Sequence, residues 1–205
     1  AAFQAMQDSG LVAGENIDPF RLATYVGSGI GGFQTIQREL EKFNEDKSGK
    51  WVSPNFVPTM ISDIAGGQIA IKYGAKGSYI DIVTACTPST HCLRNSFRAI
   101  MHWYSEAMIA CGADHCTYPN RIAGFSNARA LTRAEDPKYS SLPFNANRSG
   151  FVMADGAAIL ILEEYGHALA RGAKIYAEMV GYGSTCDAYH ATAPRPDAST
   201  QAECI

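Results

Sequence analysis

The sequence lacks an apolar run of about 18 residues, which is the length that a helix needs to cross a bilayer. It also lacks a basic segment followed by an apolar core at its start, so we expect no secretory signal peptide. An excess of positive charge is absent too, because the formal net charge is -3 at pH 7. Such a chain has no general electrostatic attraction to nucleic acid or to anionic lipid. We therefore expect a cytoplasmic protein that binds neither nucleic acid nor membrane.

Cysteines paired at zinc-binding spacing are also missing. The six cysteines are irregularly spaced, which in a chain of this length is typical of reduced thiols rather than of a disulfide framework. Neither Cys111 with His115 and Cys116 nor Cys86 with Cys92 forms the paired C-x-x-C pattern of structural zinc sites. We expect no metal ion, and we interpret Cys92 and Cys111 as buried thiols that act as small hydrophobic residues.

The chain does have enough apolar sequence for a hydrophobic core. Of its 205 residues, 46% are hydrophobic and 18% are charged, which is typical of a globular protein with one or two domains. Residues 1–10 begin inside a helical repeat without an initiator Met, and residues 197–205 contain no terminating element. We therefore expect a fragment of a longer protein.

Extended and helical patterns alternate along the chain. The runs expected to be strands are residues 21–26, 79–84, 107–110 and 174–182, with a hairpin over residues 150–163 that turns at Asp155-Gly156. The segments expected to be helices are residues 1–10, 33–43, 55–73, 88–104, 120–131 and 164–171. This order predicts an α/β protein with a parallel sheet covered by helices on both faces.

The turn at residues 27–32, GSGIGG, follows a strand and precedes a helix, as nucleotide-binding turns do. Its spacing is not G-x-G-x-x-G, and no acidic residue stands suitably on a following strand. The favoured interpretation is a tight turn that lets the backbone approach a ligand or a neighbouring helix closely. Small residues also recur at Ala65, Gly66 and Gly67, and they predict close packing of the helix that contains them.

One cysteine stands where an extended run becomes a helix. Residues 79–84 are rich in β-branched and aromatic side chains, which is typical of a buried strand, and a helical repeat follows from Leu93. Cys86 lies between them, with Thr87 placed to cap the helix and Pro88 suited to its first turn. The positive end of a helix dipole favours the thiolate, which is the nucleophilic form, and the free amides there can hold an oxyanion. Cys86 is therefore the candidate nucleophile.

A cysteine nucleophile needs a proton acceptor, and histidine is the usual one. The chain has five histidines, which are His91, His102, His115, His167 and His190. His91 follows Cys86 by one helical turn, but a helix points its side chains away from a nucleophile at its N-terminus. A polar contact or a surface position is therefore favoured for His91, with a catalytic role as the open alternative. His190 follows a strand end, where sites in open α/β sheets lie, and we interpret the other three as structural.

A longer series of short motifs surrounds Cys86. They are residues 84–87 (TACT), 123–125 (AGF), 128–131 (ARAL), 150–152 (GFV), 155–157 (DGA), 162–163 (LE), Ala168, 171–173 (RGA) and 187–190 (DAYH). In order and spacing this series resembles the β-ketoacyl-acyl carrier protein synthases, and synthase II in particular, over essentially the whole chain. The resemblance implies a thiolase-like α/β fold, with this chain as the N-terminal half of a layered αβαβα architecture whose sheet is mixed and mostly parallel.

The resemblance implies a role for three residues. Cys86 matches the cysteine that accepts the growing acyl chain from acyl carrier protein as a thioester, and its backbone amide matches half of the oxyanion hole. Ile30 matches a residue that lines the acyl pocket, and Thr192 lies where the family has a threonine in the substrate pocket. Such an enzyme of fatty acid biosynthesis decarboxylates malonyl-acyl carrier protein and condenses the resulting carbanion with the acyl group.

The resemblance also implies partners and a domain organisation. Family members are cytosolic homodimers that need no metal or organic cofactor beyond the phosphopantetheine arm of the carrier protein. Residues 55–64 would border the dimer interface. The two active-site histidines and the lysine of the family belong to its C-terminal half, beyond Ile205, and its first strand precedes Ala1. Residues 1–205 are thus expected to be a partial N-terminal domain with the start of the link to the C-terminal half, and to be inactive alone.

The chain differs from the usual family residues at several positions. Pro88 stands where small residues are usual, Asn145 and Ser149 stand where carboxylates are usual, and Ala154 replaces a glycine. Two other functions stay open. One is a non-catalytic partner subunit that shapes the cavity, although such subunits typically lose the cysteine. The other is a cysteine acyl-hydrolase that uses Cys86 and a histidine.

Overall fold

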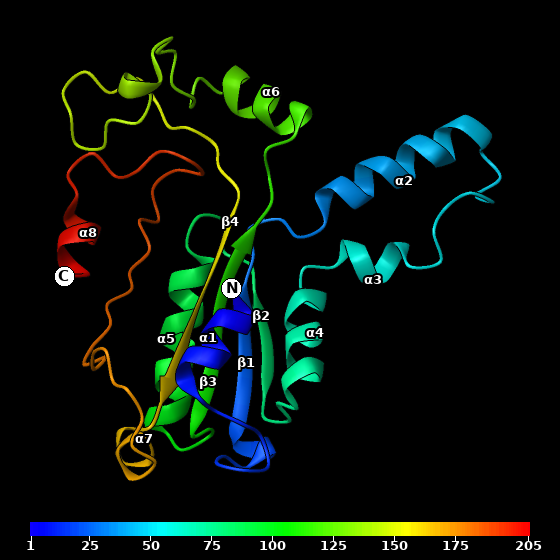
Figure 1. The fold of residues 1–205 in the computed structure, drawn as a ribbon. Coiled ribbons are helices and arrows are strands. Elements are labelled where there is room, and N and C mark those ends of the chain that lie inside the picture. Colours follow the sequence, from blue (N-terminus) through cyan, green and yellow to red (C-terminus); the bar gives the residue numbers. More distant parts are fainter. The chain divides into compact units, whose positions relative to one another are not determined.

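The computed structural model describes residues 1–205, which divide into two compact units. The first unit is Ala1–Lys174 and the second is Ile175–Ile205. All the strands belong to the first unit (Figure 1). Both hydrophobic clusters belong to it as well. The first unit therefore holds the core of the protein.

Four strands of the first unit form one sheet (Figure 1). They are β1 (Leu22–Gly27), β2 (Tyr79–Ile82), β3 (Ala107–Asp114) and β4 (Gly156–Glu163), in the spatial order β2-β1-β3-β4. β1 is parallel to both β2 and β3, whereas β3 and β4 are antiparallel. The sheet is therefore mixed and mostly parallel, which confirms the predicted sheet type.

The two central strands are apolar because both faces of the sheet are covered. Every residue of β1 (LATYVG) is buried, and so are the first five residues of β3 (AMIAC). β2 lies at an edge of the sheet, and none of its four residues is buried. The expectation of a buried strand at residues 79–84 is therefore wrong, because β-branched and aromatic residues suit an edge strand as well as a central one.

Two hydrophobic clusters lie on opposite faces of the sheet, since neighbouring side chains of a strand point to opposite sides. One cluster, beneath α5 (Pro88–Met101), contains Ala23, Tyr25, Cys92, Ala99, Met108 and Ala110. The other contains Met6, Leu11, Ile17, Leu22, Ala107 and Ile109, and is covered by α1 (Ala2–Ser9) and α4 (Ile64–Tyr73). Helices on both faces of the sheet are thus confirmed.

α4 packs closely on the sheet at one glycine. A Cβ atom at Gly66 would lie 2.5 Å from Cε2 of Tyr79 and 2.6 Å from Cγ2 of Val26. Gly67 faces open space, so only part of the close packing predicted from the small residues is present. The hydroxyl of Tyr79 donates to the carbonyl oxygen of Asp63, and burial is the main reason that the pKa of Tyr79 rises to about 12.

The other helices of the first unit are α2 (Phe33–Asp46), α3 (Phe56–Met60), α6 (Pro119–Asn127) and α7 (Tyr165–Ala170), with 3-10 turns at Pro19–Arg21 and Pro137–Tyr139. The single helix expected over residues 55–73 is in fact two helices, α3 and α4. They are separate because Ile61, which follows α3, is extended, with φ -70° and ψ 133°. α2 and α3 contact each other beyond the edge of the sheet where β2 lies (Figure 1).

A buried carboxylate connects α2 to the segment before α3. Glu39 is only 1% exposed, and its oxygens accept from Nζ of Lys42 at 2.8 Å, from the amide of Ser53 at 2.7 Å and from Nε of Arg38 at 3.2 Å. The hydrogen bond from Lys42, followed by that from Ser53, lowers the pKa of Glu39 to about 2. Glu39 therefore stays ionised and fixes the end of the loop between the two helices.

The hairpin expected over residues 150–163 is absent. β4 begins directly after Asp155 and pairs with β3, whereas the preceding residues 150–155 make only one bridge, with the segment after α6. Asp155 does not turn the chain, because its carboxylate accepts hydrogen bonds from the backbone amides of Cys116 and Thr117 in the loop after β3. A nonlocal contact has replaced the local turn that Asp-Gly predicts.

The second unit contains one short helix, α8 (Ser199–Glu203), and no strand. The strand expected over residues 174–182 is not formed, since the sheet consists of β1 to β4. Within this unit the carboxylate of Asp187 accepts from the amide of Arg195 at 2.9 Å and from the hydroxyl of Thr200. None of the helices in either unit has both the length and the apolar character that a membrane span requires.

Candidate active site

Cys86 lies exposed in a tight turn between β2 and α5. The residue before it, Ala85, has a φ of 51°, a left-handed conformation that costs a non-glycine residue roughly 1–3 kcal/mol. This turn places Cys86 beside the N-terminus of a 14-residue helix, and no backbone acceptor takes the N–H of Cys86. A thiol next to a helix N-terminus and a free amide combine a nucleophile with a donor for an oxyanion.

Two threonines and a histidine stabilise this turn. The hydroxyl and the amide of Thr87 both donate to the carbonyl oxygen of Thr84, at 3.0 and 3.1 Å. The hydroxyl of Thr84 is hydrogen-bonded to Nδ1 of His91 at 2.8 Å. The polar contact favoured for His91 is therefore present, and it is made with Thr84. Thr87 occupies the N-cap position of α5, but its side chain accepts no amide proton, so the expected side-chain cap is absent.

Two glycines let α5 begin directly against the sheet. A Cβ atom at Gly27, the last residue of β1, would lie 2.5 Å from the carbonyl carbon of Pro88. A Cβ atom at Gly112 of β3 would lie 1.9 Å from Oγ of Ser89 and 2.5 Å from its Cβ. Pro88 is buried as the first residue of the helix, as predicted. Close contact with β1 and β3 thus positions the first turn of α5, and with it Cys86.

The glycine turn at residues 27–32 lies against the turn that carries Cys86. A Cβ atom at Gly29 would be 3.1 Å from the carbonyl oxygen of Ala85. The amide of Gly29 donates to both carboxylate oxygens of Asp114, at 3.0 and 3.2 Å, and the hydroxyl of Ser28 donates to the same carboxylate at 3.3 Å. The turn therefore holds a carboxylate of the chain itself, which agrees with a tight structural turn rather than a phosphate site.

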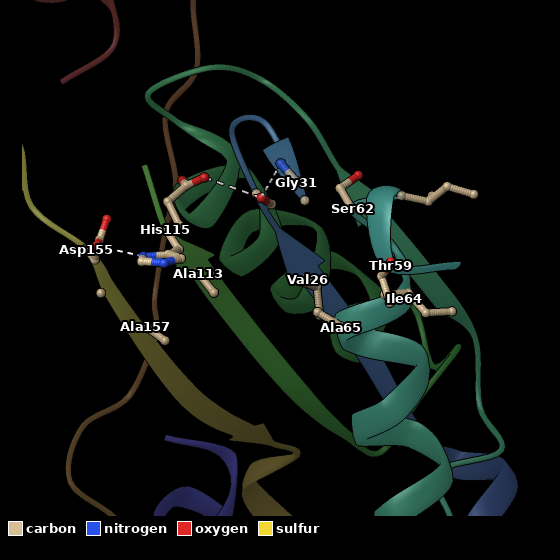
Figure 2. Close-up of a pocket in the computed structure, with 15 residues that line it drawn as sticks. Val26, Gly31, Thr59, Ser62, Ile64, Ala65, Ala113, His115, Asp155 and Ala157 are labelled. Carbon is tan, nitrogen blue, oxygen red and sulfur yellow. Dashed lines mark hydrogen bonds and ion pairs between the residues drawn. The ribbon is translucent and has the colours of Figure 1, made fainter. Parts of the chain in front are cut away.

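A pocket of about 430 Å³ opens at the carboxyl ends of β1 and β3 (Figure 2). Ser28 and Gly31 line it after β1, Asp114 and His115 line it at the end of β3, and Ser62 lines it from the segment before α4. β2 and β3 lie on opposite sides of β1, and open α/β sheets bind ligands where successive strands diverge in this way. The pocket thus occupies the edge of the sheet at which a ligand is expected.

His115 and Asp155, which line the pocket, are hydrogen-bonded to each other (Figure 2). Nδ1 of His115 lies 2.6 Å from Oδ2 of Asp155, and the hydroxyl of Tyr118 is hydrogen-bonded to the other ring nitrogen. The hydroxyl of Thr117, followed by the amide of Cys116 and the ring of His115, holds the pKa of the Asp155 carboxyl well below its usual range. The ionised carboxylate orients the imidazole, which joins the loop after β3 to the start of β4.

The other two expected site residues lie in different units. Ile30 is at the tip of the glycine turn, 48% exposed, directly after Gly29, which touches the turn of Cys86. Thr192 lies in the second unit, where its amide donates to Nδ1 of His190 at 3.1 Å. The first unit therefore brings Ile30 close to the turn of Cys86, and the roles of Cys86, Ile30 and Thr192 stay predictions.

Two further cysteines and a histidine have structural surroundings, as expected. Cys92 is fully buried with its thiol 3.0 Å from the carbonyl oxygen of Tyr25, and Cys111 is buried in β3. Burial raises the pKa of each thiol to about 11, so both are neutral at physiological pH. His167 is hydrogen-bonded to Glu163 at 2.5 Å. No three side chains of the types that bind metals lie close enough together to hold one ion.

The sequence interpretation missed the acidic side chains of the pocket. Asp114 is the last residue of β3, and Asp155 directly precedes β4. The rule that open α/β sheets place their sites at strand ends could have selected Asp114, because it closes an apolar run. Asp155 offered only a turn signal, so no local pattern pointed to its role.

Several known proteins that are similar to this chain are of one kind. Residues 1–168 match the protein family described as Beta-ketoacyl synthase, N-terminal domain. The chain is 45% identical over 198 residues to 3-oxoacyl-acyl-carrier-protein synthase 2 of Synechocystis sp., and 44% identical over 200 residues to the protein of the same name from Vibrio cholerae. These matches cover 96% and 97% of the chain but 47% and 48% of the relatives. The chain thus spans about half the length of the curated relatives that it matches.

Solved structures that are similar to this chain are of the same kind as these relatives. One of them is described as a type II PKS acyl-carrier protein in complex with its ketosynthase bound to the hexaketide. The whole chain superposes on 52% of a chain of that structure, with a TM-score of 0.92 and 32% sequence identity. It also superposes with a TM-score of 0.88 and 30% identity on 50% of a Beta-ketoacyl synthase from Burkholderia phymatum. The expected thiolase-like fold is thereby confirmed.

Proposed function

Because the chain belongs to the Beta-ketoacyl synthase family, we propose that it is the part of a fatty-acid condensing enzyme that carries the acyl-accepting cysteine. In the whole protein, Cys86 attacks an acyl thioester and keeps the acyl group as its own thioester, releasing the thiol of the carrier. Malonyl-acyl carrier protein then loses CO2, and the carbanion attacks the Cys86 thioester to give the β-ketoacyl product. The names of the relatives support this reaction class.

The observation that carries the proposal is the geometry around Cys86. Its thiol is exposed, its backbone N–H has no backbone acceptor, and the N-terminus of α5 begins two residues later. A tetrahedral intermediate on Cys86 places a negative oxygen near these donors, which stabilise developing charge without reorganising. The left-handed Ala85 keeps the turn tight and presents the thiol outward.

The substrates and partners form part of the same proposal. Acyl carrier protein delivers both thioesters on its phosphopantetheine arm, so the enzyme itself uses no metal or organic cofactor. One of the structures similar to this chain is described as a ketosynthase complex with an acyl-carrier protein, which supports such a partner. Ile30 lines the acyl pocket next to Cys86, and Thr192 contributes to the substrate pocket. We further propose a cytoplasmic homodimer, as the resemblance implies.

Two alternative functions predict different outcomes. A non-catalytic partner subunit needs no nucleophile, and the presence of Cys86 in a strained turn at a helix N-terminus argues against it. A cysteine hydrolase needs a base within hydrogen-bond reach of the thiol. His91, one helical turn after Cys86, is hydrogen-bonded to Thr84, and no histidine is hydrogen-bonded to Cys86. The condensing function is therefore the better supported of the three.

A two-step labelling experiment separates these functions. The whole protein is incubated with acyl carrier protein that carries a radiolabelled acyl group, and malonyl-acyl carrier protein is added afterwards. A condensing enzyme first retains the label and then releases it as β-ketoacyl product. Release of labelled free acid before the malonyl addition would instead indicate a hydrolase, and no retention at all would indicate a non-catalytic subunit.

The chain of 205 residues by itself should not catalyse the condensation of acyl and malonyl groups. The resemblance assigns the histidines and the lysine that drive decarboxylation to the other half of the family's proteins. We expect no β-ketoacyl product from this chain alone under the same assay. Measurable product would mean that a proton-handling group of this chain, such as His91 or His115, replaces them.

A further inference from the structure

Arg121 is a buried cation that lacks a protein partner. Its side chain is 7% exposed, and none of its three guanidinium nitrogens has a hydrogen-bond acceptor. The guanidinium carbon lies 4.2 Å from the centre of the Phe33 ring. Stacking on an aromatic ring offsets part of the desolvation of a guanidinium but satisfies none of its five N–H donors. Because burying a charge without a partner is costly, the arrangement points to an anion at this position.

Two helix N-termini add to the positive potential around this guanidinium. Arg121 is in the first turn of α6, and Phe33 is the first residue of α2. Neither helix has an acidic residue in its first turn or a side-chain cap, and the N–H groups of Gln34 and Thr35 have no backbone acceptor. The N-terminal end of a helix attracts anions and disfavours cations. The fold therefore gathers three sources of positive potential, whereas the carboxylates of Asp114 and Asp155 are hydrogen-bonded to the glycine turn before α2 and to the loop before α6.

We propose that Arg121 and the N-terminus of α2 bind the distal carboxylate of an acyl group that has carboxyl functions at both ends. The inference rests on the proposed function, because it takes Cys86 as the acyl acceptor. It names the substrate class of that site as α,ω-dicarboxylic acyl thioesters. A carboxylate fits the planar guanidinium fork with two parallel hydrogen bonds, and its single charge balances the single charge of Arg121.

The glycine turn links the nucleophile to this anion site. A Cβ atom at Gly29 would lie 3.1 Å from the carbonyl oxygen of Ala85, the residue before Cys86. Ile30 follows Gly29, and Phe33 comes three residues later. Consecutive Cα atoms are about 3.8 Å apart, so the Cα atoms of Ile30 and Phe33 lie within roughly 11 Å of each other. In this proposal an acyl chain leaves Cys86, passes Ile30 and ends at the guanidinium stacked on Phe33.

The test compares dicarboxylic with monocarboxylic acyl groups on the same carrier protein. The whole protein is supplied with glutaryl, pimeloyl and azelaoyl groups and with the methyl ester of each, and kcat/KM for condensation is measured. We expect kcat/KM to be higher for at least one acyl group with a free distal carboxylate than for its methyl ester. In the variant Arg121→Met that preference, expressed as the ratio of kcat/KM for the acid to kcat/KM for its ester, should fall roughly 30-fold or more, because one partner of a buried charge pair is lost.

Two further variants control for charge and folding. Arg98→Gln removes a positive charge from an exposed position on α5 and should keep the preference. Arg121→Lys keeps the positive charge but lacks the planar guanidinium fork, so it should retain only part of the preference for the free acid over its ester. Activity with the esters shows that each variant is folded.

Each contrary outcome has a distinct meaning. Equal kcat/KM for every acid and its ester in the parent protein would overturn the inference and leave the proposed function intact. If Arg121→Met lowered kcat/KM equally for the acids and the esters, the inference would be overturned. The bound anion would then be the phosphodiester of the carrier's arm, which all these substrates share. Failure of every acyl group to reach Cys86 would overturn the proposed function and the inference with it.

Discussion

Replacing Gly112 with alanine tests whether the sheet positions the turn that carries the candidate nucleophile. The new Cβ atom would lie 1.9 Å from Oγ and 2.5 Å from Cβ of Ser89, which is in the first turn of α5. Rotation of the hydroxyl relieves the first contact, but the second requires the helix to move. Adding a methyl group to a tightly packed site costs about 1–3 kcal/mol. We expect Gly112→Ala to lower the free energy of unfolding in urea by that amount.

A double variant shows whether the contact itself is responsible. Ser89→Gly removes both clashing atoms and leaves Cα at 3.4 Å, so it should recover about 1 kcal/mol or more of the loss in Gly112→Ala. Gly27→Ala is the matched contrast, because its Cβ would meet backbone atoms of Pro88, which Ser89→Gly does not remove. The reaction rate of Cys86 with a thiol reagent reports movement of the turn. Additive effects of Gly112→Ala and Ser89→Gly would refute the reasoning.

The remaining predictions concern α4 and the carboxylate of Glu39. Gly66→Ala places a Cβ atom 2.5 Å from Cε2 of Tyr79 and should lower the free energy of unfolding by about 1–3 kcal/mol. Gly67→Ala, which faces open space, should leave that energy unchanged or raise it by up to about 1 kcal/mol, and equal effects of the two changes would contradict the packing of α4. Folding lowers the pKa of Glu39 from 4.5 to about 2, so its hydrogen-bonded ion pairs stabilise the fold above pH 4.5 and are lost as the pH falls toward 2. The difference in urea midpoint between the parent and Glu39→Gln should therefore shrink over that range, and a difference independent of pH would argue against it.

The elements around Cys86 could be predicted because their signals are local. The apolar run of residues 22–27 and the helical repeat after Pro88 each identify an element without reference to the rest of the chain. The junction between β2 and α5 follows from the change of period at Cys86. Its consequences for a thiol follow from the helix N-terminus alone.

The pocket and the anion site could not be predicted, because they depend on contacts between distant segments. Asp155 reads as a turn residue, yet its carboxylate binds His115, which stands 40 residues earlier. Arg121 has the sequence surroundings of an exposed helical arginine, yet it is buried, and Phe33 of α2 lies against its guanidinium. Residues 174–182 show the converse, since their strand pattern forms no strand.

The identity of the acylated cysteine is the most direct test of the proposed function. The whole protein is incubated with hexanoyl-acyl carrier protein, and the mass of the intact protein and of its peptides is measured. We predict a mass increase of one hexanoyl group on the peptide of Cys86, absent in Cys86→Ser and retained in Cys186→Ser, which alters the other exposed cysteine. A hexanoyl group on a different residue, or full acylation of Cys86→Ser, would contradict the account.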